Sequence, residues 1–343
     1  MAQSVSLTES AGYGAPGSFT GKLAVVTGGG SGMGRELVRQ LATQGCSVAA
    51  CDLNSGAVAE AAATARRAPR PASGSPAMPA TCPTRRRSCG SAMSCSRCTP
   101  AITSTWSSAM RVSTAAAASS ATAGRSGSAR SPSTGGASIY CARAFLPLLI
   151  ASDHGVLVNT SSVNGFWASL GPGMPNTAYS AAKFAVKGFS EALIEDLRAH
   201  APHVRVAVVM PGHVGTDIVA NSFRARGLPE PGQMSDAEVE ELIPRDARAG
   251  LIRAGVLAEG ASADALRQML VRANADFRDN APVSAAEAAA LILDGVRSGA
   301  WRILVGKGAK TLDALVRAKP EAAYDYAELG RMAAEAPAAA PER

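Results

Sequence analysis

Two hydrophobic patterns alternate along most of the chain. Short apolar runs of about 4–8 residues, which favour buried strands, occur at residues 23–27, 47–51, 204–210 and 301–306 and in the segment that ends at Ser162. Apolar residues also recur with helical spacing, for example at Leu37, Val38 and Leu41. Strands that alternate with helices predict an α/β protein whose parallel sheet is flanked by helices.

A glycine-rich turn lies between the first strand and the first helix. Residues 28–34 read Gly-Gly-Gly-Ser-Gly-Met-Gly, and Asp52 stands at the carboxyl end of the second strand. Glycines let a backbone approach a pyrophosphate, the helix N-terminus faces its charge, and the acid accepts the ribose hydroxyls. A merely flexible glycine loop is the alternative. The surrounding strand, helix and strand favour a dinucleotide site.

Tyr179 and Lys183 lie four residues apart, after a strand that ends in Asn-Thr-Ser-Ser162. Residues with this spacing share one face of a helix. An ammonium beside a phenol lowers the phenol's pKa from its reference value of about 10, so Tyr179 is a candidate general acid and base. The Ser162 hydroxyl is a candidate to hold the oxygen at which the proton moves. Alone this spacing is weak, but the glycine-rich turn upstream makes it specific.

Together these motifs resemble the short-chain dehydrogenase/reductase family over residues of about 20–66 and 139–310. Thr27-Gly28-x-x-x-Gly32-x-Gly34 matches the family's cofactor motif, and residues 211–216, Pro-Gly-His-Val-Gly-Thr, match its nicotinamide segment. The resemblance implies a Rossmann-type doubly wound parallel sheet with a helical substrate lid. It also implies cofactor contacts from Thr27, Gly28, Ser31, Gly32, Met33, Gly34, Asp52, Leu53, Tyr179, Lys183, Pro211, Gly212, Val214 and Thr216.

The resemblance implies an NAD(H)-dependent oxidoreductase that interconverts an alcohol and a ketone or aldehyde. Tyr179 would exchange the proton, Lys183 would lower the pKa of Tyr179 and hold the nicotinamide ribose, and Ser162 would orient the substrate oxygen. Ser162 lies 17 residues before Tyr179, farther than is usual in the family. The choice between Ser161 and Ser162 therefore stays open.

Asp52 predicts that NAD(H) is preferred, with NADP(H) as the alternative. A carboxylate accepts both ribose hydroxyls and repels a 2′-phosphate. No Arg or Lys lies between Thr27 and Gly34. Arg35, just beyond the last glycine, is the nearest cation that could favour NADP(H).

The window of residues 66–138 does not fit this picture. It holds ten Arg, no Lys, no Asp or Glu and four of the seven Cys. The chain carries a net charge of +7, so the remainder outside this +10 window sums to −3. The window shows neither strand nor helix periodicity where a doubly wound sheet needs its third and fourth strands. It is therefore predicted to be disordered or misfolded.

We hypothesise that this window is the product of a displaced reading frame. Back-translation with GC-rich codons and a one-base shift lets residues 77–113 be read as a family-like text that ends in Asn-Ala-Gly-Ile, and the written frame resumes near Tyr140. The alternative is a genuine low-complexity, disordered insert. As written, the chain has Met-Arg-Val at residues 110–112 in place of the Asn-Ala-Gly turn and Thr134 in place of the family's catalytic Asn. An inactive or damaged relative with weak nucleotide binding is thus the second interpretation.

Residues 1–20 are expected to form a flexible tail, residues 21–310 a single domain with a helical lid at 217–285, and residues 311–343 a C-terminal helix and tail. The first 20 residues lack a basic and apolar signal, and no run reaches the ~18 apolar residues of a membrane span. Cys95 and Cys98 form a lone C-x-x-C, which does not predict a metal site.

The basic triplet at residues 85–87 lacks interleaved aromatics and a binding fold, so no nucleic-acid partner is expected. We expect a cytoplasmic homodimer or homotetramer that acts on a small alcohol or carbonyl substrate. Nothing in the sequence identifies that substrate.

Overall fold

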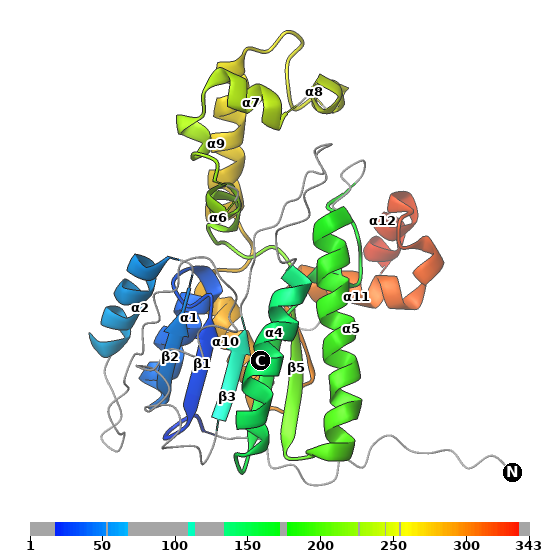
Figure 1. Cartoon of the computed structure of the whole chain (residues 1–343). Helices are drawn as coiled ribbons and strands as arrows, with labels where there is room; N and C mark the ends of the chain where they lie inside the picture. The colour runs from blue at the N-terminus through cyan, green and yellow to red at the C-terminus, as the bar shows by residue number, and fades with distance from the viewer. Residues whose placement is uncertain are drawn as a thin grey trace, which may run out of the picture.

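Six parallel strands form one sheet in the order β2-β1-β3-β4-β5-β6 (Figure 1). The computed structural model describes residues 18–52, 54–67, 109–113, 134–171, 177–225, 227–243, 245–253 and 255–335. The strands are β1 (Leu23–Thr27), β2 (Ser47–Cys51), β3 (Ala109–Ser113), β4 (Gly155–Thr160), β5 (Val204–Pro211) and β6 (Arg302–Val305). This order reverses between β1 and β3, and the carboxyl ends of strands at such a switch point are where open α/β sheets bind ligands. The predicted Rossmann-type sheet is confirmed.

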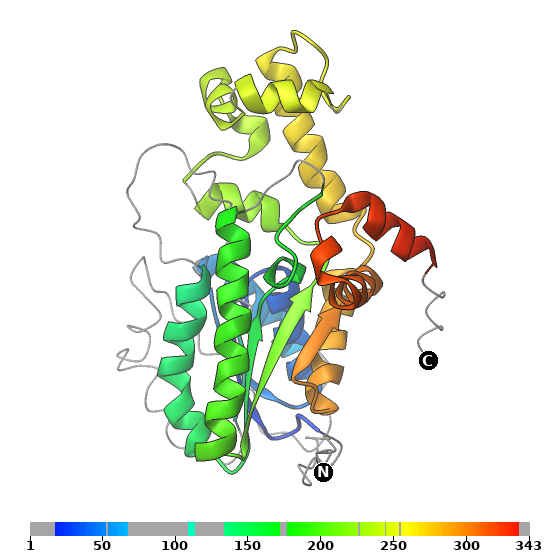
Figure 2. The same cartoon turned by 90° about the vertical axis from the view of Figure 1, so that its right-hand side faces the viewer.

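Helices cover both faces of the sheet, and α4 and α5 lie together on one of them (Figures 1 and 2). The helices on and after the sheet are α1 (Gly32–Thr43), α2 (Ser55–Arg67), α4 (Thr134–Ile150), α5 (Thr177–His200), α10 (Ala285–Arg297), α11 (Lys307–Ala318) and α12 (Tyr326–Glu335). Short 3-10 turns are η2 (Val163–Gly165), η3 (Pro231–Gln233) and η4 (Pro320–Ala322). All six residues of β4 are buried, as expected of a strand covered on both faces.

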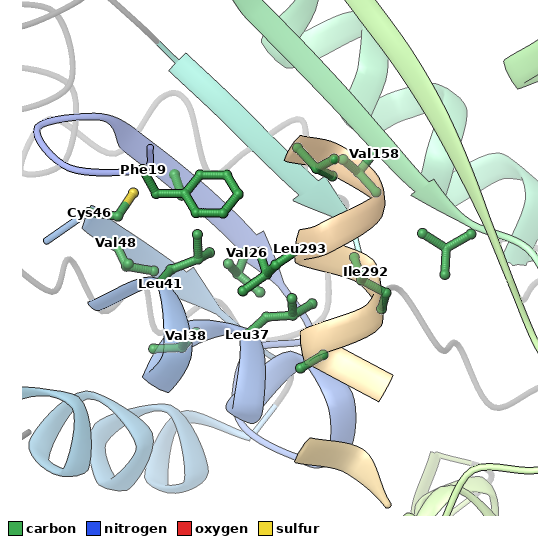
Figure 3. Close-up of a cluster of buried hydrophobic side chains, with 14 of the residues drawn as sticks. Phe19, Val26, Leu37, Val38, Leu41, Cys46, Val48, Val158, Ile292 and Leu293 are labelled. Atoms are coloured by element: carbon green, nitrogen blue, oxygen red, sulfur yellow. The ribbon is translucent and has the colours of Figure 1, made fainter. Parts of the chain in front are cut away.

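The main hydrophobic core lies between the sheet and helices α1, α2 and α10 (Figure 3). Phe19 belongs to this core and is 2% exposed. The sequence analysis placed Phe19 in a flexible tail of residues 1–20. This prediction is wrong for Phe19, which is part of the core. Burying an aromatic side chain contributes about 1.5–3 kcal/mol, and the guanidinium of Arg297 lies 4.9 Å from the centroid of the Phe19 ring.

An inner strand, β3, lies within the window for which the residue pattern predicted no strand. β3 pairs in parallel with β1 on one side and β4 on the other, with Ser113 opposite Thr27 and Asn159. The window of residues 66–138 was expected to supply neither of the inner strands that the sheet needs there. This expectation is wrong for β3. Two neighbouring strands offer backbone hydrogen bonds on both sides, which outweighs the weak strand propensity of the written residues.

Four helices form a separate segment beyond the carboxyl ends of the strands (Figure 1). They are α6 (Ile218–Ala225), α7 (Asp236–Leu242), α8 (Arg245–Arg253) and α9 (Ala263–Asp279). The α6–α9 segment has its own hydrophobic cluster, in which Val239 and Leu266 are fully buried. Capping boxes begin α7 at Ser235 and α10 at Ser284.

The chain continues beyond the expected C-terminal helix. α11 follows Gly306, which has a φ of +94°. The structure then adds α12, where the sequence analysis expected only a tail.

Candidate active site

Ser162, Tyr179 and Lys183 meet at the carboxyl end of β4. Ser162 begins the turn η2, where its Oγ accepts a hydrogen bond from the backbone N of Asn164 at 3.2 Å. The same hydroxyl is hydrogen-bonded to Tyr179. Lys183 lies one turn further along α5, with its Nζ 5.5 Å from the centroid of the Tyr179 ring. Helix α5 thus places the phenol beside both the serine hydroxyl and the ammonium.

Ser161 makes a different contact. Its buried Oγ donates a hydrogen bond to the backbone oxygen of Lys183 at 2.7 Å. A Cβ atom added to Gly165 would lie 2.2 Å from this Oγ, so the turn requires glycine. Of the two serines that the sequence left open, Ser162 is the one in contact with Tyr179.

Burial dominates the electrostatics of this group. It lowers the pKa of Lys183 to about 8, and the Nζ donates a hydrogen bond to the backbone oxygen of Thr160 at 3.1 Å. Burial also raises the pKa of Tyr179, and the hydrogen bond from Ser162 opposes this rise. The expected lowering of the Tyr179 pKa is therefore wrong for this structure. Desolvation of the phenolate outweighs its stabilisation by neighbours.

The glycine-rich turn folds over the end of β2. Gly28 and Gly32 have φ values of +73° and +50°, a region in which glycine has no steric penalty. The backbone N of Gly30 donates to Oδ2 of Asp52 at 3.0 Å. A Cβ atom at Gly30 would lie 3.1 Å from this same oxygen, and one at Gly29 would lie 2.9 Å from Cβ of Ala50. The turn and the acid therefore form one compact unit.

The segment after β5 returns to the start of α1. Gly212 donates from its backbone N to the oxygen of Val305 at 3.1 Å, and Val214 is buried. The side chain of Thr216 lies 3.0 Å from the Cβ position of Gly32. Ser31 precedes α1 without a side-chain capping bond to the helix.

The remaining predicted cofactor residues are placed as follows. Thr27 ends β1, Met33 packs against the core, Gly34 is buried in α1, and Pro211 ends β5. Leu53 lies outside the described residues, as do residues 68–108 and 114–133 of the anomalous window.

Sequence reasoning missed two groups that shape the site. The backbone oxygen of Thr160 holds Lys183, and no side-chain pattern reports a carbonyl. Asn164 is 4% exposed, and its Nδ2 donates to the oxygens of Trp167 and Ser169. The sequence offered one signal for Asn164, because it is a polar residue in the unusually long stretch between Ser162 and Tyr179.

Two searches of the described residues were negative. Within the ranges given above, no group of three or more His, Cys, Asp or Glu side chains is arranged to hold a metal ion. None of the described helices has the length and apolar character needed to cross a membrane.

The family model for short chain dehydrogenase matches residues 22–83 and 136–227, which carry the glycine-rich turn, Ser162, Tyr179 and Lys183. Over these two segments, which make up less than half of the chain, the protein is similar to the short-chain dehydrogenase/reductase family. The two matched segments lie on either side of the greater part of the anomalous window.

Among curated relatives, the Mycobacterium tuberculosis protein named as an oxidoreductase, SadH, is 32% identical over 177 residues, which are 51% of this chain and 48% of that protein. The 3-ketodihydrosphingosine reductase of Bacteroides thetaiotaomicron is 39% identical over 80 residues, 23% of this chain and 27% of that protein. The matches thus span about half or less of the length of these relatives.

Solved structures support the fold. A short-chain dehydrogenase/reductase from Burkholderia phymatum in complex with NAD has a TM-score of 0.57 at 23% identity, with 89% of this chain and 94% of that chain covered. A short-chain dehydrogenase from Burkholderia cenocepacia in complex with NADP has a TM-score of 0.54 at 16% identity, with 91% and 98% covered.

Proposed function

We propose that this protein is an NAD(H)-dependent oxidoreductase that interconverts an alcohol and a ketone or aldehyde. The observation that carries the proposal is the hydrogen bond between Ser162 and Tyr179, with the ammonium of Lys183 beneath the phenol ring. General acid–base catalysis requires a proton-exchanging group and a second group that fixes the reacting oxygen. These three side chains supply both.

The residues at the switch point fit a dinucleotide. The glycine-rich turn leaves little room for Cβ atoms at Gly29 and Gly30, and the start of α1 presents backbone amides suited to a pyrophosphate. Asp52 stands where an adenosine ribose would be held. A bound nicotinamide cofactor would supply or accept the hydride. The NAD and NADP in the structural neighbours and the name of SadH support this assignment.

The proton chemistry follows from the two pKa shifts. Lys183, with a pKa of about 8, is mostly charged at pH 7. Tyr179, with a raised pKa, is protonated there and can donate to a carbonyl oxygen that becomes an alcohol. In the reverse direction the Tyr179 phenolate must accept that proton, and the hydrogen bond from Ser162 stabilises this phenolate. Ser162 holds the substrate oxygen beside the phenol.

Turnover on a panel of alcohols with NAD, and of ketones and aldehydes with NADH, tests the proposal through the change in nicotinamide absorbance. Activity toward at least one substrate class is expected. Binding of NADH without turnover of any panel member would instead favour the non-enzymatic relative, an interpretation that rests on the missing Asn-Ala-Gly turn.

A further inference from the structure

The C-terminal part of the chain holds the segment that begins with Ser162. We call residues 162–171 the serine loop. Trp167 donates from Nε1 to the backbone oxygen of Ala323 at 2.6 Å, 156 residues away in sequence. The backbone N of Ala168 donates to the Tyr324 hydroxyl at 3.1 Å. Two consecutive residues of the loop are therefore bonded to the turn before α12.

Tyr326, the first residue of α12, makes the most contacts with the loop. Its hydroxyl lies 2.7 Å from Oγ of Ser169 and donates to the backbone oxygen of Gly171 at 3.1 Å. Its ring packs edge-on against Trp167, with centroids 6.2 Å apart and an interplanar angle of 76°. One side chain thus joins three positions of the serine loop.

A hydrogen-bonded path leads from Tyr326 to the Ser162 hydroxyl. Tyr326 contacts Ser169, whose backbone oxygen accepts from Nδ2 of Asn164 at 2.6 Å. The backbone N of Asn164 donates to Oγ of Ser162 at 3.2 Å. Ser162, Asn164 and Ser169 are all buried, at 7%, 4% and 5% exposure, so water does not readily replace these bonds.

Residues of β6 and α11 also contact the first part of the serine loop. The guanidinium of Arg302 on β6 lies 5.6 Å from the centroid of the Phe166 ring and is paired with Asp313 of α11. Both charged side chains are about nine-tenths buried. Phe166 therefore rests on a fixed ion pair rather than on a mobile surface charge.

We propose that Tyr326 is a positioning residue that holds the Ser162 hydroxyl in place through the serine loop. This rests on the proposed function, in which Ser162 orients the substrate oxygen. A reacting group must be held to within about 0.5 Å by supporting contacts. Ser162 itself is held by one backbone amide and by Tyr179, and the outer contacts of its loop converge on α12. Loss of the Tyr326 hydroxyl loosens the loop and misplaces Ser162.

Hydrogen exchange tests whether Tyr326 holds the serine loop, and this test does not require the protein to turn over a substrate. In Tyr326→Phe, amides of the serine loop should exchange ~2- to 10-fold faster, the factor that a single hydrogen bond contributes, while amides of β5 stay unchanged. Tyr140→Phe, at an exposed tyrosine of α4, is the matched control and should leave the loop unchanged. Unchanged loop exchange in Tyr326→Phe would overturn the proposal, even for a chain that turns over no substrate.

Coupling to Ser162 tests the consequence for chemistry. Tyr326→Phe should lower kcat ~2- to 10-fold and leave the Kd for NADH unchanged. In a Ser162→Ala background the same substitution should have no further effect on kcat, because its target is gone. An equal loss of kcat in both backgrounds would mean that Tyr326 acts through general stability and would sink the proposal. Absence of turnover in the unaltered chain would refute only the proposed function. The hydrogen-exchange result would still show whether Tyr326 holds the serine loop.

Discussion

Ser161 and Ser162 are consecutive residues whose hydroxyls make different contacts. Ser161 donates to the backbone oxygen of Lys183 at 2.7 Å, whereas Ser162 is hydrogen-bonded to Tyr179. Ser161 therefore fixes η2 against α5, whereas Ser162 contacts the side chain that is proposed to exchange the proton. Both are buried, so the difference is one of direction and not of exposure.

This pair gives matched variants. Ser162→Ala should lower turnover by ~10²–10³, the loss observed when one donor to a reacting oxygen is removed. Ser161→Ala should instead lower the free energy of unfolding by about 1 kcal/mol, the net contribution of one buried hydrogen bond, and leave most of the turnover. Steady-state kinetics and denaturant unfolding of both variants separate the two roles. A reversed result would assign the substrate oxygen to Ser161.

Tyr179→Phe removes the proton donor and keeps the ring. Turnover should fall by ~10²–10⁴, the usual contribution of general acid–base catalysis, and the Kd for NADH should change little. Tyr140→Phe on α4, which is exposed, serves as the control and should keep full activity. Near-normal turnover of Tyr179→Phe would show that the proton takes another route.

Lys183 predicts a pH dependence of stability. Burial lowers its pKa from 10.5 to about 8, so folding disfavours the charged form. The cost is complete below pH 8, shrinks as the pH rises from 8 to 10.5, and vanishes above. A shift of this size corresponds to about 3 kcal/mol, and the lost bond to Thr160 offsets about 1 kcal/mol of the gain.

Lys183→Met should therefore raise the free energy of unfolding at pH 7 by about 2 kcal/mol, with an advantage that fades between pH 8 and 10.5. Denaturant unfolding across this range measures the difference from the unaltered chain. Lys187→Met, on the same helix and ion-paired with Glu191, should change stability by less than about 1 kcal/mol. A pH-independent gain for Lys183→Met would contradict the buried charge.

Local sequence signals were sufficient for the elements that carry the family motifs. The strand, glycine turn and helix around Gly32, and the helix with Tyr179 and Lys183, depend on short-range spacing and burial periodicity. Phe19 was missed because a single aromatic after a polar tail has no periodicity. Its partners in the core, such as Leu41 and Val48, come from elsewhere in the chain.

Two further features depend on long-range contacts that no local pattern reports. β3 exists because β1 and β4 flank it, although its own residues are weak strand formers. The hydrogen bonds between α12 and the serine loop join residues that are separated by at least 155 positions in the sequence. The direction of the Ser161 hydroxyl likewise follows from the packing of α5 against η2.

The displaced reading frame makes a prediction about the gene. Sequencing the coding DNA across codons 60–142 should reveal two compensating single-base changes, after which the translated text contains Asn-Ala-Gly. The restored text adds an amphipathic helix and an apolar strand. At about 25 cal/mol per Å² of buried apolar surface, the restored protein should unfold at a higher denaturant concentration than the written chain. An uninterrupted frame that encodes residues 66–138 as written, with the same text in close relatives, would refute the idea.

Cofactor choice is predicted from Asp52. Its Oδ2 accepts from the backbone N of Gly30, which leaves the carboxylate at the rim of the glycine-rich turn. A 2′-phosphate there would meet a like charge a few ångströms away, a cost of about 1–4 kcal/mol between water and a surface-like dielectric. NADH should therefore bind about ten- to a thousandfold more tightly than NADPH. Arg35, the residue after the last glycine of the turn, is exposed on α1 and is a cation able to oppose this preference.

Two variants separate the charge of Asp52 from its structural bond. Asp52→Asn keeps an oxygen that can accept from Gly30 but removes the charge, and Asp52→Ala removes both. Titration of NADH and NADPH should show the preference relaxed in both variants, because the charge causes it. Asp52→Ala alone should also weaken NADH binding through a looser turn. Relaxation in Asp52→Ala but not in Asp52→Asn would assign the preference to turn geometry. Tighter binding of NADPH by the unaltered chain would mean that Arg35 outweighs Asp52, and Arg35→Ala should then restore the preference for NADH.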